Sequence, residues 1–342
     1  MRAVLLKGHG GFEQLELARV PVPLPAAGQA LVRVGAAGVN NTDINTRIGW
    51  YAKTSTAAGG WTGSAFHFPR IQGADAAGLI VAVGPDVEVA RIGERVLIDP
   101  IIRRTDAGAL RSVSYLGSEC DGAFAEFLVV PAINAVRIST TLSDAELASF
   151  PCSYLAAENM LSRAQLRSGE TLLVTGASGG VGTAAVQLAR RRGATVLAIA
   201  GTGKADAVKA LGASQVFDRD ADLVARLGRD SVDVVADVAG GAQFPAFLEL
   251  LRPFGRYAVA GAIAGAAVNL DLRVLYLKDL RLLGCTVPEP HVFADLVGYI
   301  ERAEIKPVVA RTFPLSEIVA AQQEFLRKRH AGKIVLTIGS SA

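Results

Sequence analysis

An apolar segment that runs directly into a glycine-rich turn is the strongest chemical signal in the sequence. Residues 171–175 are followed by a turn that reads Gly-Ala-Ser-Gly-Gly-Val-Gly, in which Ala177 stands at the first glycine of the usual G-x-G-x-x-G pattern. Glycine lets backbone amides approach a pyrophosphate closely, and a helix N-terminus attracts its negative charge. An unliganded strand-to-helix turn is the alternative. We predict a dinucleotide site with contacts from Gly176, Ser178, Gly179, Gly180 and Val181.

The segment about 20 residues past this turn decides between the two nicotinamide cofactors. NAD-selective proteins place an acid there to bond the ribose 2′-hydroxyl, whereas this sequence has Gly201, Thr202 and Lys204. Glycine cannot repel a 2′-phosphate, threonine offers a donor, and lysine offers a positive charge. Lys204 could instead be an exposed lysine at a helix start, although that is the unfavourable end of the helix dipole for a cation. We predict NADP(H) as the cofactor, with Gly261 and Lys333 as further binding residues.

The chain has two parts with different patterns of expected secondary structure, and these patterns predict which elements hold the candidate residues. Up to residue 138, short strands are broken by turns, as at 30–34, 78–83, 95–98 and 124–130. From about residue 143, strands and helices alternate, with strands expected at 171–175, 195–200, 216–217, 232–237, 256–260 and 280–285. This succession predicts a doubly wound parallel sheet, a Rossmann fold of the α/β class. The long segments 52–68 and 103–119 are expected to be loops.

The composition is that of a globular chain with room for two domains. Its 342 residues are 51% hydrophobic and 20% charged, which allows large cores. The net charge of +3 is spread along the chain, so we expect no nucleic-acid partner. No run reaches the roughly 18 apolar residues of a membrane helix, and Met1 opens a strand pattern rather than a signal peptide. We expect a cytoplasmic protein that does not bind membranes.

Six short segments together resemble the medium-chain dehydrogenases/reductases over essentially the whole chain. They lie at residues 1–7, 38–43, 73–78, 93–96, 121–127 and 332–336, in addition to the glycine turn. The resemblance implies a GroES-like, mostly-β catalytic domain made of both chain ends, with the Rossmann domain inserted. The expected divisions are residues 1–138 for the first part of the catalytic domain, 139–285 for the cofactor domain, and 286–342 for the returning segment.

The positions that hold the catalytic metal in this family predict a metal-free site here. The zinc enzymes use a Cys after Gly-Val, a His after the Gly of a Gly-His-Glu segment, and usually a later Cys. This sequence has Asn40, Ala74 and Cys152 at those positions, and a catalytic zinc needs about three protein ligands. The family's structural zinc needs four closely spaced cysteines, and only Cys120 lies in that region. Cys152 is then expected to be a small apolar helix residue.

The resemblance is closest to the zinc-free quinone oxidoreductases. Their pattern has an Asp three residues after the Asn of Gly-Val-Asn, an Arg four further on, and a later Tyr. The matching residues here are Asn40, Asp43, Arg47 and Tyr51. Asn45 departs from the pattern, because the family has a Tyr at that position.

Thr42 matches the hydroxyl that relays a proton in the zinc alcohol dehydrogenases. The resemblance therefore implies a catalytic set of Asn40, Thr42, Asp43 and Tyr51. Asp43 and Arg47 could instead form an i,i+4 ion pair on a helical turn, worth about 0.3–0.5 kcal/mol. Asn40 could simply cap the turn.

Without a metal to polarise a carbonyl, hydride transfer requires an acceptor that is already electrophilic. Quinones and α,β-unsaturated carbonyls (enones) fit, with donors from Asn40, Thr42 and Tyr51 to the developing oxyanion. One alternative is a zinc-free reductase of a specific thioester or metabolite, such as an enoyl reductase. Another is an NADPH-binding sensor or crystallin-like binder with little turnover. We also expect a homodimer, because the apolar strand at 281–285 should be an exposed sheet edge.

Overall fold

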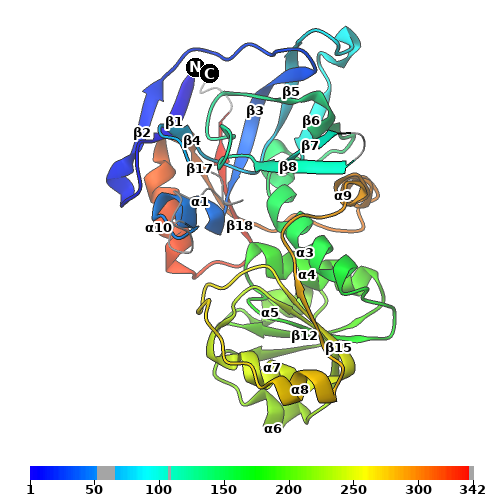
Figure 1. Cartoon of the computed structure of the whole chain (residues 1–342). Helices are drawn as coiled ribbons and strands as arrows, with labels where there is room; N and C mark the ends of the chain where they lie inside the picture. Colours follow the sequence, from blue (N-terminus) through cyan, green and yellow to red (C-terminus); the bar gives the residue numbers. More distant parts are fainter. Residues whose placement is uncertain (52–65, 107–108, 339–342) are drawn as a thin grey trace. The chain divides into compact units, whose positions relative to one another are not determined.

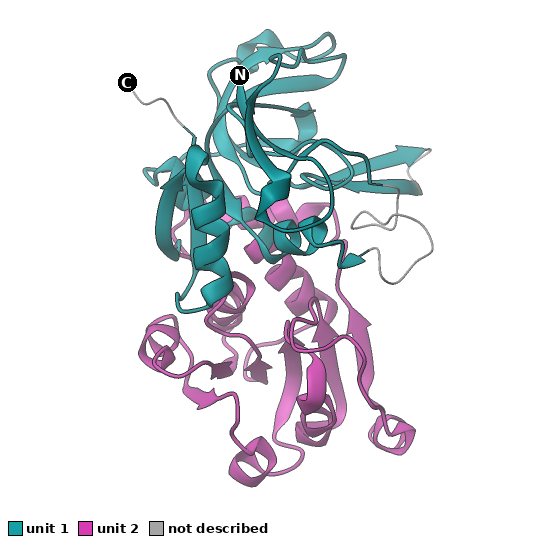
Figure 2. Cartoon of the chain, turned by 90° about the vertical axis from the view of Figure 1, so that its left-hand side faces the viewer, with its two compact units in different colours: residues 1–152, 307–342 teal, residues 153–306 magenta. Residues whose placement is uncertain are grey.

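The computed structural model describes residues 1–51, 66–106 and 109–338, and the chain forms two compact units (Figure 2). Unit 1 comprises Met1–Cys152 with Pro307–Ala342, and unit 2 comprises Ser153–Lys306. Both divisions lie later in the chain than the sequence placed them. Asp144 belongs to unit 1 because its carboxylate accepts from the Arg95 guanidinium at 2.6 Å. Lys306 belongs to unit 2 because its backbone N–H donates to Gln187 Oε1 at 2.9 Å.

Unit 1 is mostly β-structure, and Figure 1 labels β3, β5, β6, β17 and β18 of its large sheet. The strands of this sheet follow the order β10-β6-β5-β3-β18-β17, and β9 also pairs with β3. The strands of this sheet are β3 (Gln29–Val39), β5 (Ala77–Val83), β6 (Arg95–Ile98), β9 (Phe127–Pro131), β10 (Ala135–Arg137), β17 (Val309–Pro314) and β18 (Lys333–Thr337). A second sheet joins β1 (Arg2–Leu6), β2 (Leu15–Arg19) and β4 (Arg70–Ile71). The helices are α1 (Asn41–Arg47), α2 (Asp144–Leu147) and α10 (Ile318–Arg327). Because β18 pairs antiparallel with β3, the predicted return of the chain end to the N-terminal domain is confirmed.

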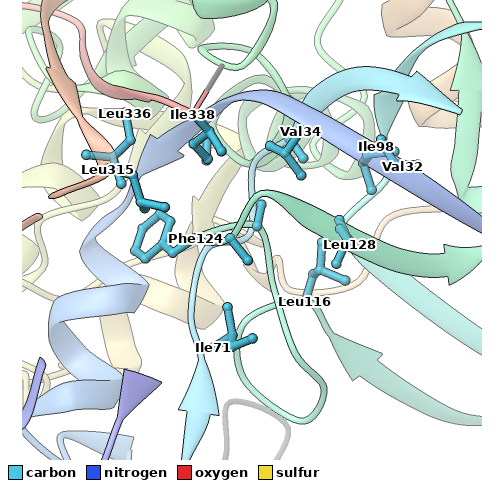
Figure 3. Packing of buried hydrophobic residues seen from close by; sticks show 14 of the residues in the cluster. Val32, Val34, Ile71, Ile98, Leu116, Phe124, Leu128, Leu315, Leu336 and Ile338 are labelled. Carbon is cyan, nitrogen blue, oxygen red and sulfur yellow. The ribbon is translucent and has the colours of Figure 1, made fainter. Parts of the chain in front are cut away.

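The core of unit 1 lies against one face of this sheet and draws residues from both ends of the chain (Figure 3). Val32 and Val34 on β3 are buried, in keeping with the alternation that the sequence shows. Phe124 and Leu336 complete the same cluster from distant segments, and both are fully buried. Burying such side chains contributes roughly 1.5–3 kcal/mol each, which fixes β18 beside β3.

One predicted loop is instead a hairpin. Within 103–119 the structure places most of β7 (Ile101–Asp106) and β8 (Ala109–Tyr115), which pair antiparallel from Ile101 with Tyr115 onward. The expectation was wrong because it rested on polar composition, whereas ladder hydrogen bonds use the backbone alone. The other long segment, 52–68, falls largely outside the described residues, so its assignment as a loop stays a prediction.

Unit 2 contains a parallel sheet in the order β13-β12-β11-β14-β15-β16, as predicted for a doubly wound fold. Its strands are β11 (Thr171–Val174), β12 (Thr195–Ala200), β13 (Gln215–Asp218), β14 (Val232–Asp237), β15 (Leu251–Val259) and β16 (Arg281–Gly284). The helices are α3 (Pro151–Arg163), whose first two residues belong to unit 1, α4 (Gly180–Arg191), α5 (Ala205–Ala210), α6 (Leu223–Leu227), α7 (Phe244–Leu250), α8 (Leu272–Leu277) and α9 (His291–Glu301). The strand order reverses between β11 and β14, where such folds bind dinucleotides. Across the described ranges, no helix has the length and apolar character to cross a bilayer.

Candidate active site and cofactor site

The glycine turn of unit 2 joins β11 to α4 as the sequence predicts. Gly176 has φ +57°, and Gly179 is the extended N-cap residue of α4. A Cβ on Gly182 would lie 2.2 Å from the Gly176 carbonyl oxygen, so only glycine fits there. The amides of the first helical turn have no partner within a helix. Since α4 has 12 residues, this turn can hold a pyrophosphate at a full helix N-terminus.

Ala177 explains how the turn tolerates a departure from three glycines. Its side chain is fully buried, and its backbone N–H donates to the Ile199 carbonyl at 2.9 Å. The methyl group and the amide of Ala177 are therefore both used inside unit 2, and the amides of Gly180 and Val181, at the start of α4, are the ones placed to meet a ligand. Ser178 lies in the same turn and is also buried.

A pair of cations lies beside Gly201, at the ends of β12 and β13. A Cβ on Gly201 would lie 2.6 Å from Arg219 Nη2, so the guanidinium covers this glycine. The pKa of Lys204 is lowered, first by burial and then by the positive charge of Arg219. An anion placed between the two cations would relieve this repulsion. The pair of Lys204 and Arg219 is therefore suited to hold an anion.

The same corner also carries an acid. Thr202 Oγ1 donates to Asp218 Oδ1 at 3.1 Å, so the threonine hydroxyl contacts a carboxylate of β13. Asp218 is the last residue of β13 and Arg219 follows it, and neither was singled out from the sequence. Their position after the next predicted strand could have identified them, because adjacent parallel strands end at the same edge of the sheet.

Gly261 and Lys333, the other two predicted cofactor residues, lie in different units. Gly261 follows β15, and a Cβ there would lie 2.7 Å from the Val238 carbonyl oxygen, so glycine lets the loops after β14 and β15 meet. Lys333 begins β18 and is buried in unit 1. Its contact with a cofactor stays a prediction.

Lys333 forms a buried ion pair with Asp75. The Lys333 Nζ lies 2.7 Å from Asp75 Oδ2, and the two side chains are 4% and 0% exposed. Lys333 also donates to Asn40 Oδ1, and Asn40 Nδ2 donates to Asp75 Oδ2 at 2.8 Å. The second oxygen of Asp75 accepts from the Cys152 backbone N–H at 2.6 Å. Asp75 thus ties together the start of α1, the start of α3 and β18.

Asn40, a predicted catalytic donor, uses its carboxamide internally. Besides Asp75, its Nδ2 donates to the Gly38 carbonyl at 3.3 Å. Its two amide hydrogens are therefore engaged by the protein, and its oxygen accepts from Lys333. The geometry favours a positioning role for Asn40 at the start of α1 rather than donation to a substrate.

Asp43 is a buried carboxylate on the first turn of α1. Its Oδ2 accepts from the Asn40 backbone N–H at 2.7 Å, as in a helix N-terminal cap. Burial, opposed by this hydrogen bond, raises the pKa of Asp43 to about 7. Such a group exchanges protons near neutral pH.

The alternative ion pair between Asp43 and Arg47 is wrong. Both residues are described, and Arg47 points elsewhere: Nε donates to Gln322 Oε1 at 3.0 Å and Nη1 donates to the Gly10 carbonyl at 2.8 Å. Its guanidinium also lies 4.4 Å from the centre of the Phe12 ring. Arg47 is buried and joins α1 to α10 and the N-terminal segment.

The structure brings Tyr51 and Thr42 together. The Tyr51 hydroxyl donates to Thr42 Oγ1 at 3.4 Å and accepts from Asn45 Nδ2 at 3.4 Å. Asn41 Nδ2 donates to Asn45 Oδ1 at 3.2 Å, so Asn45 is itself held. Asn45, the departure from the family pattern, here supports the phenol that follows it.

The residues at the family's metal positions do not match a zinc ligand set. Among the described residues, no group of three or more His, Cys, Asp or Glu side chains is placed to hold a metal ion. Cys152 accepts a hydrogen bond from the Tyr115 hydroxyl at 3.1 Å, and burial raises the pKa of its thiol to about 12. The Lys333 ammonium already contacts Asp75 and Asn40.

Two family profiles cover most of the chain. Residues 26–140 match the alcohol dehydrogenase GroES-like domain, and residues 180–302 match the zinc-binding dehydrogenase family. A solved structure from Sinorhizobium meliloti, provisionally assigned as an alcohol dehydrogenase, is 48% identical with a TM-score of 0.92, covering 98% of this chain and 96% of that one. The chain therefore belongs to the medium-chain dehydrogenase/reductase superfamily, and it is an oxidoreductase by family.

Two relatives named for different activities are similar to this chain over its length. A quinone oxidoreductase of Pongo abelii is 28% identical over 99% of this chain and 98% of its own length. An acryloyl-coenzyme A reductase of Metallosphaera sedula is 29% identical over 98% of this chain and 100% of its own length. Both are similar to this protein from end to end.

Proposed function

We propose that this protein is a zinc-independent, NADPH-dependent reductase of quinones or α,β-unsaturated carbonyls. The observation that carries the proposal is the buried Lys333–Asp75 pair with Asn40. Asn40 stands where the zinc enzymes of the family have a ligand, and here it is bonded to a buried cation whose charge Asp75 already balances. Without Lewis-acid activation of a simple ketone, acceptors that delocalise negative charge are favoured.

The cofactor fits unit 2 in two places. The glycine turn would hold the pyrophosphate through the amides of Gly180 and Val181, and Lys204 with Arg219 would hold the 2′-phosphate. When bound, NADPH supplies the hydride. The protein's own contribution is to fix the cofactor in one orientation, which can account for a large part of a rate enhancement.

The acceptor oxygen gains negative charge as it is reduced, and it needs donors. Tyr51 and Thr42 are the candidates, because their hydroxyls lie 3.4 Å apart. Either hydroxyl could turn toward a developing oxyanion in place of the other. Asp43, with its pKa near 7, is a candidate proton source within the same short segment.

The test is NADPH oxidation with a panel of small quinones and enones, combined with metal analysis of dialysed protein. We expect turnover with both acceptor classes, well under one zinc per chain, and no change in rate after EDTA treatment. One zinc per chain whose removal abolishes activity would overturn the proposal that the reductase works without zinc. NADH oxidation as fast as NADPH oxidation, with equal affinity, would overturn the cofactor assignment.

A second candidate function is reduction of an enoyl thioester. The acryloyl-coenzyme A reductase of Metallosphaera sedula, similar over its whole length, favours this class. Adding acryloyl and crotonyl thioesters to the panel separates the two: a kcat/KM at least a hundredfold higher on thioesters would favour the second candidate. Tight NADPH binding without turnover on any acceptor would instead indicate a cofactor-binding protein with little catalysis.

A further inference from the structure

A fully buried carboxylate, Asp237, ends β14 and accepts hydrogen bonds at both oxygens. Its Oδ1 accepts from Thr175 Oγ1 at 2.5 Å and from the Ala239 backbone N–H at 2.7 Å. The Gly240 N–H lies 3.1 Å from Oδ1 and 3.2 Å from Oδ2, and the Tyr257 hydroxyl donates to Oδ2. Burial and the Asp237 charge raise the pKa of Tyr257, so its hydroxyl remains a donor.

These bonds tie together the ends of three neighbouring strands. Thr175 follows β11 directly before the glycine turn, and Tyr257 lies near the end of β15. Thr175 Oγ1 also accepts from the Val238 N–H at 3.0 Å. Asp237 therefore links the strand that leads into the pyrophosphate turn to the loop Val238–Gly241, which we call the β14 loop.

The β14 loop is held from its other side by the segment after β15. Ala264 N–H donates to the Ala239 carbonyl at 2.8 Å, and Gly241 N–H donates to the Gly265 carbonyl at 3.0 Å. A Cβ on Gly240 would lie 2.6 Å from the Gly265 oxygen, so the two backbones are in close contact. The loop is thus fixed by backbone and buried side-chain contacts.

Strand order indicates which half of a dinucleotide this loop meets. The cations beside Gly201 lie at the ends of β12 and β13, so the adenosine half lies on that side of β11. The order reverses between β11 and β14, and a dinucleotide crosses the sheet edge at that point. The nicotinamide half then reaches the ends of β14 and β15, where the β14 loop stands.

We propose that Asp237 is a positioning residue that holds the β14 loop as a backbone platform for the nicotinamide half of the cofactor. This inference rests on the proposed NADPH-dependent function. A negative charge buried so close to an anion-binding turn is unfavourable unless hydrogen-bond donors compensate it, as the donors around Asp237 do. An asparagine at this position would offer one accepting oxygen instead of two. Its NH2 group would face a hydrogen-bond donor and could not accept from it.

The experiment compares NADPH with adenosine 2′,5′-bisphosphate, which has the adenosine and 2′-phosphate but no nicotinamide. In Asp237→Asn we expect the Kd of NADPH to rise about tenfold or more and kcat to fall, while the Kd of the bisphosphate changes less than about twofold. Asp222→Asn is the matched control, because it removes a carboxylate that caps α6 in the same unit. It should leave both Kd values unchanged.

Milder variants keep the test decisive if Asp237→Asn does not fold. Thr175→Val and Tyr257→Phe each delete one donor and should show the same selective loss, whereas Thr175→Ser keeps the hydroxyl and should restore NADPH affinity. Equal loss of both ligands, or no change in either, would overturn the inference. If the wild-type protein binds neither ligand, the proposed function fails instead.

Discussion

At the scale of single residues, the candidate donors Thr42 and Tyr51 are linked by hydrogen bonds between side chains of α1 and the segment that follows it. Tyr51 and Thr42 meet at 3.4 Å, a weak hydrogen bond that a substrate oxygen could replace. Asn45 donates to the phenol from the other side, which limits the orientations of the ring. The catalytic contribution of each hydroxyl can therefore be measured by its deletion.

We expect Tyr51→Phe and Thr42→Val each to lower kcat with enones by roughly 10–1,000-fold, because each variant keeps the shape and deletes a donor. The loss with quinones should be smaller, since a quinone delocalises the charge. The Kd of NADPH should stay nearly fixed. Steady-state kinetics on both acceptor classes check this, with Tyr276→Phe, an exposed tyrosine of α8, as control. Full rates in both variants would mean that positioning alone carries the reaction.

Asp43 predicts a specific dependence of stability on pH. Its pKa is about 7 in the folded protein, raised chiefly by burial, and near 3.9 in an unfolded chain. Between these values the folded state binds the proton more tightly, so the free energy of unfolding contributed by this group falls as pH rises from about 4 to about 7. Asp43→Asn removes the titration. In urea unfolding, the free energy of unfolding of the wild type minus that of Asp43→Asn should therefore decline from pH 5 to pH 8. A difference that does not change with pH would contradict the raised pKa of Asp43.

At the scale of elements, the ends of β12 and β13 form the predicted cofactor-selective corner. Arg219→Gln should raise the Kd of NADPH about tenfold, or about 1.4 kcal/mol, and leave that of NADH unchanged. Gly201→Asp should narrow or reverse the preference, because its carboxylate would pair with Arg219 and repel a 2′-phosphate. Fluorescence titration measures both constants, with Arg226→Gln on α6 as a charge-matched control. Equal losses for both cofactors would argue against a 2′-phosphate site.

The sequence predicted most strands and helices, but it predicted few of the contacts between them. Apolar runs and the glycine turn predicted the parallel sheet, because burial on both faces leaves a signal in each strand. Apolar runs could not identify Arg219, since its neighbour Gly201 follows a different strand, β12, and only the fold brings the two together. Asp75 and Asp237 were missed as hubs for the same reason: their partners are brought close only by the fold. The β7–β8 hairpin was missed because residues 103–106 are polar and residues 109–115 mix polar with apolar side chains.

At the scale of the whole molecule, the family assignment does not determine the oligomeric state, but one edge of the unit 2 sheet bears on it. The structure confirms that β16 is an edge of the unit 2 sheet, as the sequence predicted. Large apolar side chains are exposed near this edge: Phe254 at 67% and Tyr276 at 63%, with Leu282 on β16 itself at 39%. Exposed edges and apolar patches of this kind are typical of interfaces.

We therefore predict a homodimer in which β16 pairs with its copy across a twofold axis. Such pairing would satisfy the free edge of β16 and cover the apolar side chains beside it, because an isologous contact brings the same strand from both chains together. Light scattering at micromolar concentration should give twice the chain mass. Leu282→Lys sets two like charges against each other across the axis and should raise the dissociation constant roughly tenfold or more. Val89→Lys, at an exposed valine of unit 1, should leave the dimer intact. A monomeric wild-type protein at that concentration would refute the prediction, and a dimer that Leu282→Lys leaves unchanged would move the interface to another surface.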